Sequence, residues 1–200
     1  MIDKNLLKKM DSGVIYDPAV SVLQEEQKKR LVLLREYNNL SSDDTDGKEK
    51  LLKRMFASVG DSVYIEQPFY ANWAGMKVKL GSNVYINFLC TFVDDAPITI
   101  GNNVMIGPRV TLATATHPIS PALRHKGLQM NSPIVIEDDV WLASSVFVGP
   151  GVTIGRGSVI GAGSVVLHDI PPFSVACGVP ARVVRAISPE EMKDYRAESL

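Results

Sequence analysis

One histidine stands where a regular sequence pattern breaks. The stretch L-A-T-A-T-H-P occupies residues 112–118, so His117 is followed directly by a proline and then by a polar segment rich in proline, serine and charge. An imidazole changes its charge near neutral pH and can take a proton from a hydroxyl group. His117 is therefore a candidate general base, although an ordinary loop histidine fits the same position.

The other histidines and the cysteines offer less chemistry. His125 lies between two basic residues in the polar segment, where a solvated side chain is expected, and His168 follows the last regular repeat. A zinc site of three histidines does not fit these spacings, so we expect no metal. Cys90 and Cys177 show neither C-x-x-C spacing nor a disulfide pattern, and we expect buried, inert thiols.

Composition limits the classes of partner. The 200 residues suit one domain or one domain with a small appendage, and 46% are hydrophobic, enough for a sizeable core. The 21 Lys and Arg balance the 22 Asp and Glu, so no basic field for nucleic acid or for an anionic membrane is expected. The charged start, M-I-D-K-N-L-L-K-K-M-D, does not resemble a signal peptide, and no run suits a membrane span. We expect a cytoplasmic protein.

The first ~57 residues read as helical. Asp17 and Pro18 suit the N-cap and first position of a helix that continues to Tyr37. The polar segment S-S-D-D-T-D-G at 41–47 interrupts the pattern, and a second helix is predicted from about Lys48 to Phe56.

After residue 59, aliphatic residues recur at every sixth position. They are Leu80, Ile86 and Phe92, then Ile100, Ile106 and Leu112, and finally Ile136, Leu142, Val148, Ile154, Ile160 and Val166. A period of six fits neither a 3.6-residue helix nor alternating hairpin strands. It fits a solenoid of short strands and tight turns, in which stacked rungs bury a column of aliphatic side chains.

Two interruptions of this period draw attention. A small one, of two residues, lies at Pro97–Thr99, and a large one follows Leu112, because the pattern resumes at Ile136 and not near residue 118. The inserted loop, about 116–133, is of a length that is usually functional or disordered. His117 lies at its root, where a rung can hold it. At a position that is often glycine, Asn87 is either a turn residue or a carboxamide facing a cleft.

Several motifs together resemble a known family. T-A-T-H-P, D-D-V-W-L-A-S-S, I-G-A-G-S-V-V, G-V-P-A-R-V-V-R and the N-terminal K-K-M-x-S-G-x-x-Y resemble the maltose and galactoside O-acetyltransferases, a subfamily of the hexapeptide-repeat acyltransferases. The resemblance implies an all-β solenoid, a left-handed parallel β-helix. It divides the chain into an N-terminal helical cap (1–57), a β-helix with the inserted loop (58–187) and a C-terminal helical tail (188–200).

The resemblance also implies an activity and a set of site residues. The reaction would be direct transfer of an acetyl group from acetyl-CoA to a hydroxyl of a sugar or sugar-like acceptor, in a homotrimer with active sites between subunits. His117 matches the general base, Asn87 a residue near the reacting centre, and Ser144 marks the oxyanion donor. The implied acceptor contacts are Asp17, Trp73, Tyr85, Asp95 and Gln129, and the implied CoA contacts are Trp141, Ser144, Ala162, Leu167, His168, Arg182 and Arg185.

Some residues depart from the subfamily pattern. Trp73 stands where galactoside enzymes carry serine, and Gln129 stands where methionine is frequent, so the acceptor is left open. Leu167 and His168 replace a threonine–lysine pair. Besides sugar O-acetylation, the residues leave open a drug acetyltransferase of the same fold, a trimeric metal hydratase of the γ-carbonic-anhydrase type, whose histidine spacing fits poorly, and a non-catalytic scaffold.

Overall fold

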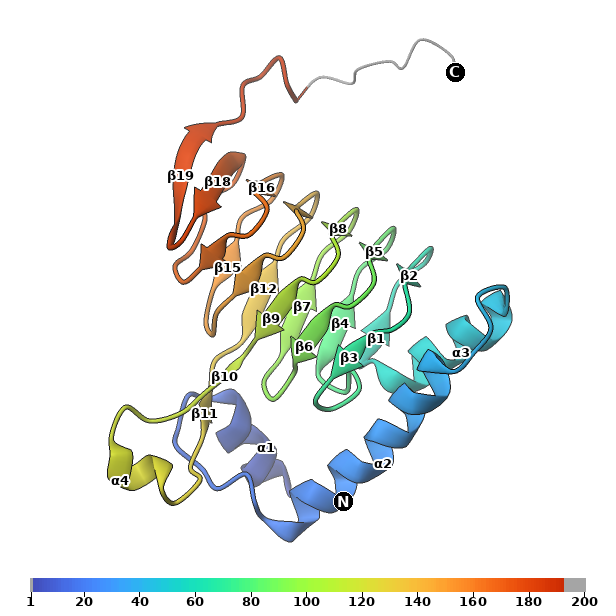
Figure 1. The fold of residues 1–200 in the computed structure, drawn as a ribbon, viewed down its shortest axis with the longest axis vertical. Helices are drawn as coiled ribbons and strands as arrows, with labels where there is room; N and C mark the ends of the chain where they lie inside the picture. The colour runs from blue at the N-terminus through green and yellow to red at the C-terminus, as the bar shows by residue number, and fades with distance from the viewer. Residues whose placement is uncertain (1, 193–200) are drawn as a thin grey trace.

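The computed structural model describes residues 2–192, which form a parallel β-helix with helices packed at its N-terminal end (Figure 1). Face 1 contains β1 (Ser58–Val59), β4 (Val78–Leu80), β7 (Ile98–Ile100), β12 (Ile134–Ile136) and β15 (Thr153–Ile154). Face 2 contains β2 (Tyr64–Ile65), β5 (Tyr85–Ile86), β8 (Met105–Ile106), β13 (Trp141–Leu142), β16 (Val159–Ile160), β18 (Ser174–Gly178) and β19 (Ala181–Ala186). Face 3 contains β3 (Tyr70–Ala71), β6 (Thr91–Val93), β9 (Thr111–Ala113), β14 (Phe147–Val148) and β17 (Val165–Val166). The solenoid predicted from the six-residue period is confirmed.

The aliphatic positions stack inside the coils. On face 2, Ile86 pairs in register with Ile106, Ile106 with Leu142, and Leu142 with Ile160, and each is at most 1% exposed. Since each two-residue strand offers one inward side chain, the period of six supplies one buried residue for every strand. The resulting column is continuous from the first coil to the last.

Polar residues close the corner between faces 1 and 2. Asn83, Asn103 and Asp139 all have positive φ there, a conformation that asparagine and aspartate tolerate. The Asn83 side chain donates to Asn103 Oδ1 at 3.1 Å, and that of Asn103 donates to Asp139 Oδ1 at 3.0 Å. Successive turns are therefore linked along the axis.

Three helices precede the solenoid: α1 (Lys4–Asp11), α2 (Ser21–Asn38) and α3 (Thr45–Met55). The prediction that Asp17 caps the long helix was wrong, because α2 begins at Ser21 after Val20. Asp17 Oδ1 accepts from the Ala19 N–H at 2.8 Å instead, a local turn that competes with helix capping. The next helix starts earlier than predicted, with Asp44 accepting from the Gly47 N–H.

The C-terminal end differs from the predicted helical tail within the described residues. β18 and β19 pair antiparallel beyond the last coils. Ser188 and Glu191 exchange the reciprocal backbone-to-side-chain bonds of a capping box, but residues 188–192 contain no helix. The remaining residues of that prediction, 193–200, lie outside the described part of the chain.

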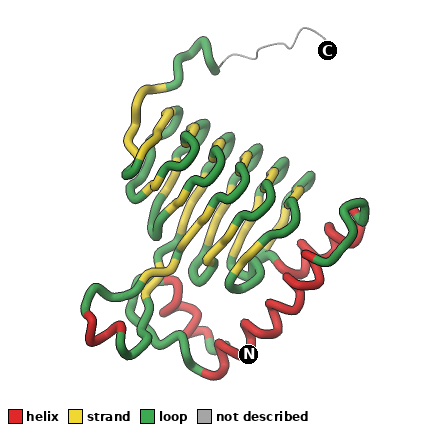
Figure 2. Tube along the Cα trace, viewed as in Figure 1, coloured by secondary structure: helices red, strands yellow, loops and turns green. Residues whose placement is uncertain are grey.

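Extra residues gather at one corner, between faces 3 and 1, which we call the 3–1 corner. The connections there are 72–77 after β3, 94–97 after β6 and 114–133 after β9, whereas β14 and β15 are joined by only 149–152. Both interruptions of the six-residue period fall here. Figure 2 shows the longest connection leaving the solenoid as an arm.

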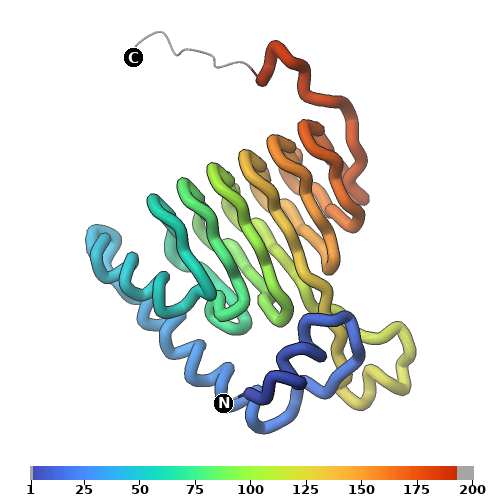
Figure 3. Tube along the Cα trace, turned by 180° about the vertical axis from the view of Figure 1, so that it is seen from behind, coloured from blue at the N-terminus to red at the C-terminus, as the bar shows by residue number. Residues whose placement is uncertain are grey.

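This arm consists of β10 (Ala115–Thr116), α4 (Pro121–Arg124) and β11 (Met130–Asn131). β10 and β11 pair antiparallel. Seen from behind in Figure 3, α1 lies beside the arm, and α1 contacts β11. The N-terminal segment and the inserted loop therefore meet at the 3–1 corner.

The helical cap is tied to the first coil by a buried phenol, which gives a stability prediction. Tyr37 is fully buried, and its hydroxyl donates to the Ile65 carbonyl at 2.6 Å. We expect Y37F to lower the free energy of unfolding by about 1–2 kcal/mol, since it leaves the carbonyl without this donor. Y70F is the matched control, because Tyr70 is 47% exposed, and should change stability by less than about 0.5 kcal/mol. Urea unfolding of both variants checks this, and equal effects would contradict it.

Asp94 at the 3–1 corner gives a pH prediction. It is fully buried, and its oxygens accept from the Trp73 and Gly75 N–H groups at 2.7 and 2.9 Å. Burial raises the pKa of this carboxyl to about 7, against the lowering effect of those bonds. A raised folded-state pKa stabilises the fold below the unfolded value, and this contribution is lost as the pH rises to 7.

The free energy of unfolding of the wild type, minus that of D94N, should therefore fall between about pH 4 and pH 7. Urea titrations at fixed protein concentration measure this difference. Other carboxylates cancel in the comparison, because both chains carry them. A difference that stays constant or increases with pH would contradict the raised pKa.

Candidate functional site

His117 directly follows β10 at the root of the arm, and its side chain is exposed. Its Nδ1 lies 2.8 Å from the carbonyl oxygen of Leu128, on the returning side of the loop. Because a carbonyl oxygen only accepts hydrogen bonds, this contact places the proton of the neutral imidazole on Nδ1. The lone pair is then on Nε2, which suits this nitrogen for taking a proton.

A groove runs along face 2 and brings several predicted site residues together. It has a volume of about 540 Å³. Tyr85, Asn87, Trp141, Ser144 and Ala162 all line it. The Trp141 indole is 48% exposed, so it offers an open aromatic wall.

The groove contains two candidate hydrogen-bond donors, the Asn87 carboxamide and the Ser144 N–H. Asn87 Oδ1 accepts from the Phe88 N–H at 2.8 Å, which leaves the Nδ2 group of the carboxamide as its free donor. The neighbouring amides of Ala143 and Ser145 donate to Ile160 and Pro108 carbonyls. Within residues 2–192 the N–H of Ser144 donates to no protein oxygen. Such donors can stabilise an oxyanion.

His117 does not line this groove. Asn87 and Ser144 lie at the corner between faces 2 and 3, whereas His117 lies beyond face 3 at the 3–1 corner. No described hydrogen bond joins them. One chain therefore holds the base and the two donors on different corners.

Three of the predicted acceptor residues form a buried cluster at the 3–1 corner. Trp73, Asp95 and Gln129 are 3%, 6% and 9% exposed. Asp95 Oδ1 lies 3.1 Å from Trp73 Nε1 and 3.2 Å from Gln129 Nε2. The structure thus brings these residues together, and their side chains contact one another.

Sequence reasoning missed two members of this cluster, Tyr16 and Asn131. Asn131 Nδ2 lies 3.0 Å from the Tyr16 hydroxyl and 2.9 Å from the Met10 carbonyl. Burial raises the pKa of Tyr16 to about 12, so the phenol is neutral. The one sequence signal for Asn131 is its spacing of two from Gln129, which places both side chains on one side of a strand. Asp17 is exposed next to Tyr16.

The predicted CoA residues beyond the groove are dispersed. Arg185 lines a second groove on face 2 that shares Trp141 and Val159 with the first. Its guanidinium bonds both Glu191 oxygens at 2.8 Å, and the same pair lowers the pKa of Glu191 to about 2. Arg182 lies on β19. Leu167 and His168 follow β17 of face 3, and both are exposed.

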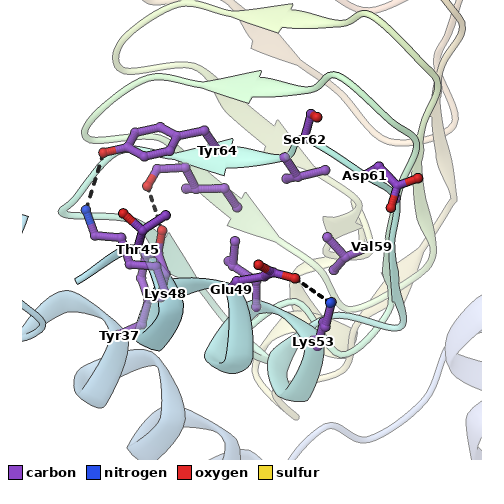
Figure 4. Close-up of a pocket in the computed structure, with 13 residues that line it drawn as sticks. Tyr37, Thr45, Lys48, Glu49, Lys53, Val59, Asp61, Ser62 and Tyr64 are labelled. Atoms are coloured by element: carbon purple, nitrogen blue, oxygen red, sulfur yellow. Dashed lines mark hydrogen bonds and ion pairs between the residues drawn. The ribbon is translucent and has the colours of Figure 1, made fainter. Parts of the chain in front are cut away.

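A separate cavity of about 230 Å³ lies between α3 and the first coil (Figure 4). Lys48, only 4% exposed, donates there to the Ser42 carbonyl at 2.9 Å and to the Tyr64 hydroxyl at 3.3 Å. Lys53 pairs with Glu49 at its rim. None of the predicted site residues lines this cavity, which belongs to the packing of helix on solenoid.

Metal binding and membrane insertion were considered for residues 2–192. Among residues 2–192, no three His, Cys, Asp or Glu side chains are grouped closely enough to hold a metal ion. Of the helices in that range, none has the length and apolar character needed to cross a membrane.

Two protein-family models match this chain, one at the N-terminal helices and one within the β-helix. Residues 9–60 match a family described as the maltose acetyltransferase hexapeptide capping motif, and residues 133–168 match the bacterial transferase hexapeptide (six repeats). The chain is 46% identical to a galactoside O-acetyltransferase of Lactococcus lactis, covering 94% of this chain and 91% of the relative. It is 41% identical to the Escherichia coli galactoside O-acetyltransferase, covering 97% of each.

Solved structures agree. A galactoside acetyltransferase in complex with coenzyme A has a TM-score of 0.90 at 39% identity, covering 99% of this chain and 97% of the other. A maltose O-acetyltransferase from Clostridium difficile has a TM-score of 0.88 at 41% identity, covering 91% and 97%. The chain belongs to the hexapeptide-repeat acyltransferases, within the maltose and galactoside O-acetyltransferase group.

Proposed function

We propose that the protein is an acetyl-CoA-dependent O-acetyltransferase that acts on a hydroxyl of a sugar or sugar-like acceptor, with His117 as general base. The observation that carries this proposal is the 2.8 Å contact between His117 Nδ1 and the Leu128 carbonyl. It leaves Nε2 without a proton on an exposed ring, as a base requires. Relatives with the names galactoside O-acetyltransferase and maltose O-acetyltransferase support the reaction class.

The proposed reaction is a direct transfer. His117 Nε2 takes the proton of the acceptor hydroxyl, and the oxygen attacks the acetyl carbonyl carbon of the thioester. A new C–O bond forms, the carbonyl oxygen becomes an oxyanion, and the C–S bond then breaks. The imidazolium returns its proton to the departing CoA sulfur, so the enzyme ends unchanged.

The groove on face 2 supplies what this intermediate needs. The Ser144 N–H and the Asn87 Nδ2 group are the proposed donors to the oxyanion. Trp141 and Ala162 flank the acetyl-bearing arm of CoA in this proposal. A solved relative binds coenzyme A and another of the same fold binds acetyl-CoA, which supports acetyl-CoA as the donor substrate. No metal is required for these steps.

The site is proposed to form between chains of a homotrimer. Base and donors lie on different corners of one chain, so a second chain must supply the missing half. Face 2 also presents an outward row of Tyr64, Tyr85, Met105, Trp141 and Val159. Met105 and Tyr64 are 56% and 39% exposed. Parallel sheets are normally covered on both sides, which supports a neighbouring subunit over this row.

The remaining assignments follow the same arrangement. Arg185 and Arg182 are proposed phosphate contacts for CoA, with Arg185 exchanging the Glu191 carboxylate for a phosphate. Leu167 and His168 are proposed to contact CoA in a groove shared with a neighbouring subunit. For the acceptor, Tyr85 and Asp17 are exposed enough for direct contact, whereas Trp73, Asp95 and Gln129 stay predicted acceptor residues whose side chains are buried in one chain.

Replacement of His117 tests the general base. We expect H117A to lower kcat by about 10²–10⁴-fold, because the acceptor hydroxyl then loses its proton acceptor. Release of CoA thiol in the presence of a panel of sugars measures the rate. H125A is the matched control and should keep wild-type activity, since that ring lies in the exposed loop. A rate in H117A within a few-fold of wild type would remove the assignment.

Mixed assemblies test the shared site. Chains carrying H117A and chains carrying N87A should each be nearly inactive alone. When they are co-expressed and the mixed trimers are purified by two tags, one site in every mixed trimer, about a third of the sites, combines an intact base with an intact groove. Activity should therefore return to about that fraction of wild type. No recovery would show that each site uses one chain only.

A further inference from the structure

We propose that Gln129, held in place by Asp95, is a positioning residue that fixes the tautomer of His117. The catalytic meaning of this role depends on the proposed function, whereas the effect on the ring can be measured without it. The two residues act on His117 through the backbone of the inserted loop. Neither touches the imidazole in any described contact.

The connection starts at the carbonyl that receives the His117 proton. Leu128 carries this oxygen, and Gln129 is the next residue. The backbone of Gln129 is paired on both sides with Tyr16: Tyr16 N donates to the Gln129 carbonyl at 2.9 Å, and Gln129 N donates to the Tyr16 carbonyl at 3.0 Å. The peptide unit between residues 128 and 129 is thus held by a bridge to the N-terminal segment.

The side chain of Gln129 anchors this bridge through hydrogen bonds of its own. Its Nε2 lies within hydrogen-bond distance of three oxygens, namely Asn131 Oδ1 at 2.8 Å, the Tyr16 hydroxyl at 3.0 Å and Asp95 Oδ1 at 3.2 Å. The residue is 9% exposed. Few waters could replace these partners, so the amide has one well-defined place.

Asp95 gives the cluster its attachment to the solenoid. It lies in the connection after β6, and its second oxygen accepts from Asn72 Nδ2 at 2.9 Å while the first faces Trp73 Nε1 at 3.1 Å. A buried carboxylate that lost these donors would be left uncompensated at a high cost in free energy. Asp95 therefore holds Gln129 against two successive coils.

The loop before Leu128 is not buried, and its own contact to this residue is one long bond, from the Leu128 N–H to the Leu123 carbonyl at 3.4 Å. From 119 to 128 no residue is buried, and Ile119 is 93% exposed. The first buried residues on the returning side are Gln129 and Asn131. These two anchors, together with the β10–β11 pairing of Thr116 with Met130, hold the returning side of the loop next to the Leu128 carbonyl. A base is effective only when it is held within about 0.5 Å of its working position.

The experiment compares Q129L with Q67L. Leucine keeps the approximate size of glutamine but has no donor, so Q129L leaves Asp95, Tyr16 and Asn131 without the shared amide. The side-chain amide of Gln67 donates to the backbone carbonyls of Tyr37 and Leu40, which belong to the helical cap. Q67L therefore controls for the loss of a partly buried amide far from the loop.

The readout is the tautomer of His117 by NMR of histidine labelled with 15N, at about pH 9, where an ordinary histidine is neutral. The chain has three histidines, and H125Q and H168Q assign the signals. In wild type and Q67L we expect the proton on Nδ1. In Q129L we expect a mixture, or the proton on Nε2, because the Leu128 carbonyl no longer has a fixed place.

Kinetics give the second readout. In Q129L we expect kcat to fall by about 10- to 100-fold, while KM for acetyl-CoA changes by less than about twofold, since the groove on face 2 is untouched. An unchanged His117 tautomer in Q129L would overturn the inference, whatever the activity. A changed tautomer in a protein whose wild type transfers no acetyl group would leave the inference standing and remove the proposed function.

If Q129L does not fold, Y16F replaces it. This variant removes only the phenol oxygen that faces Gln129 and Asn131. We expect the same change of tautomer at a smaller extent. A folded Y16F in which His117 stays wholly protonated on Nδ1 would contradict the role of the cluster.

Discussion

The constraint on which this structure depends is the pairing of each coil with its neighbours. Each inner strand of the solenoid uses its backbone groups in parallel pairing with the coils on either side, and its inward side chain in the aliphatic column. A substitution or insertion within a strand would disturb several rungs together. Chemistry is consequently left to the corners and to the outward side of the faces.

The corners are used unequally. The corner between faces 1 and 2 carries turn residues linked by short polar side chains. The 3–1 corner receives the extra residues of three successive coils, and the longest of these connections leaves the stack with His117 at its root. The N-terminal segment packs against the same corner, where Met10, Tyr16, Leu23 and Trp73 form a second small core. This cap thus supports the loop as well as the end of the solenoid.

The solenoid and the place of the loop were predictable from sequence, because the aliphatic period is local and each residue such as Ile106 or Leu142 reports its own burial. In the structure, both interruptions of the period fall at the 3–1 corner. The contacts of Tyr16 and Asn131 in the cluster around Asp95 were not predictable. They join Tyr16 to Gln129 and Asn131 across more than 100 positions, and no periodic pattern contains such a contact. The start of α2 was mispredicted because a local turn at Asp17 competes with capping.

The sequence also did not predict that His117 and Asn87 lie at different corners of one chain. In sequence, both are simply irregular positions in the repeat, and the motifs place them in one site. In the fold they lie on different corners, since a shift of six residues moves a side chain to the next face. Sequence spacing along a solenoid therefore predicts which corner a residue occupies, but proximity between corners depends on how chains assemble.

The most direct test of the account is a crystal structure of the protein with coenzyme A bound. We expect the sulfur of CoA in the groove lined by Trp141 of one subunit to lie within about 4 Å of His117 Nε2 of a neighbouring subunit, close to the separation of reacting groups. A sulfur bound more than about 10 Å from every His117 imidazole, well beyond reach of proton transfer, would contradict the assignment of this histidine as the base.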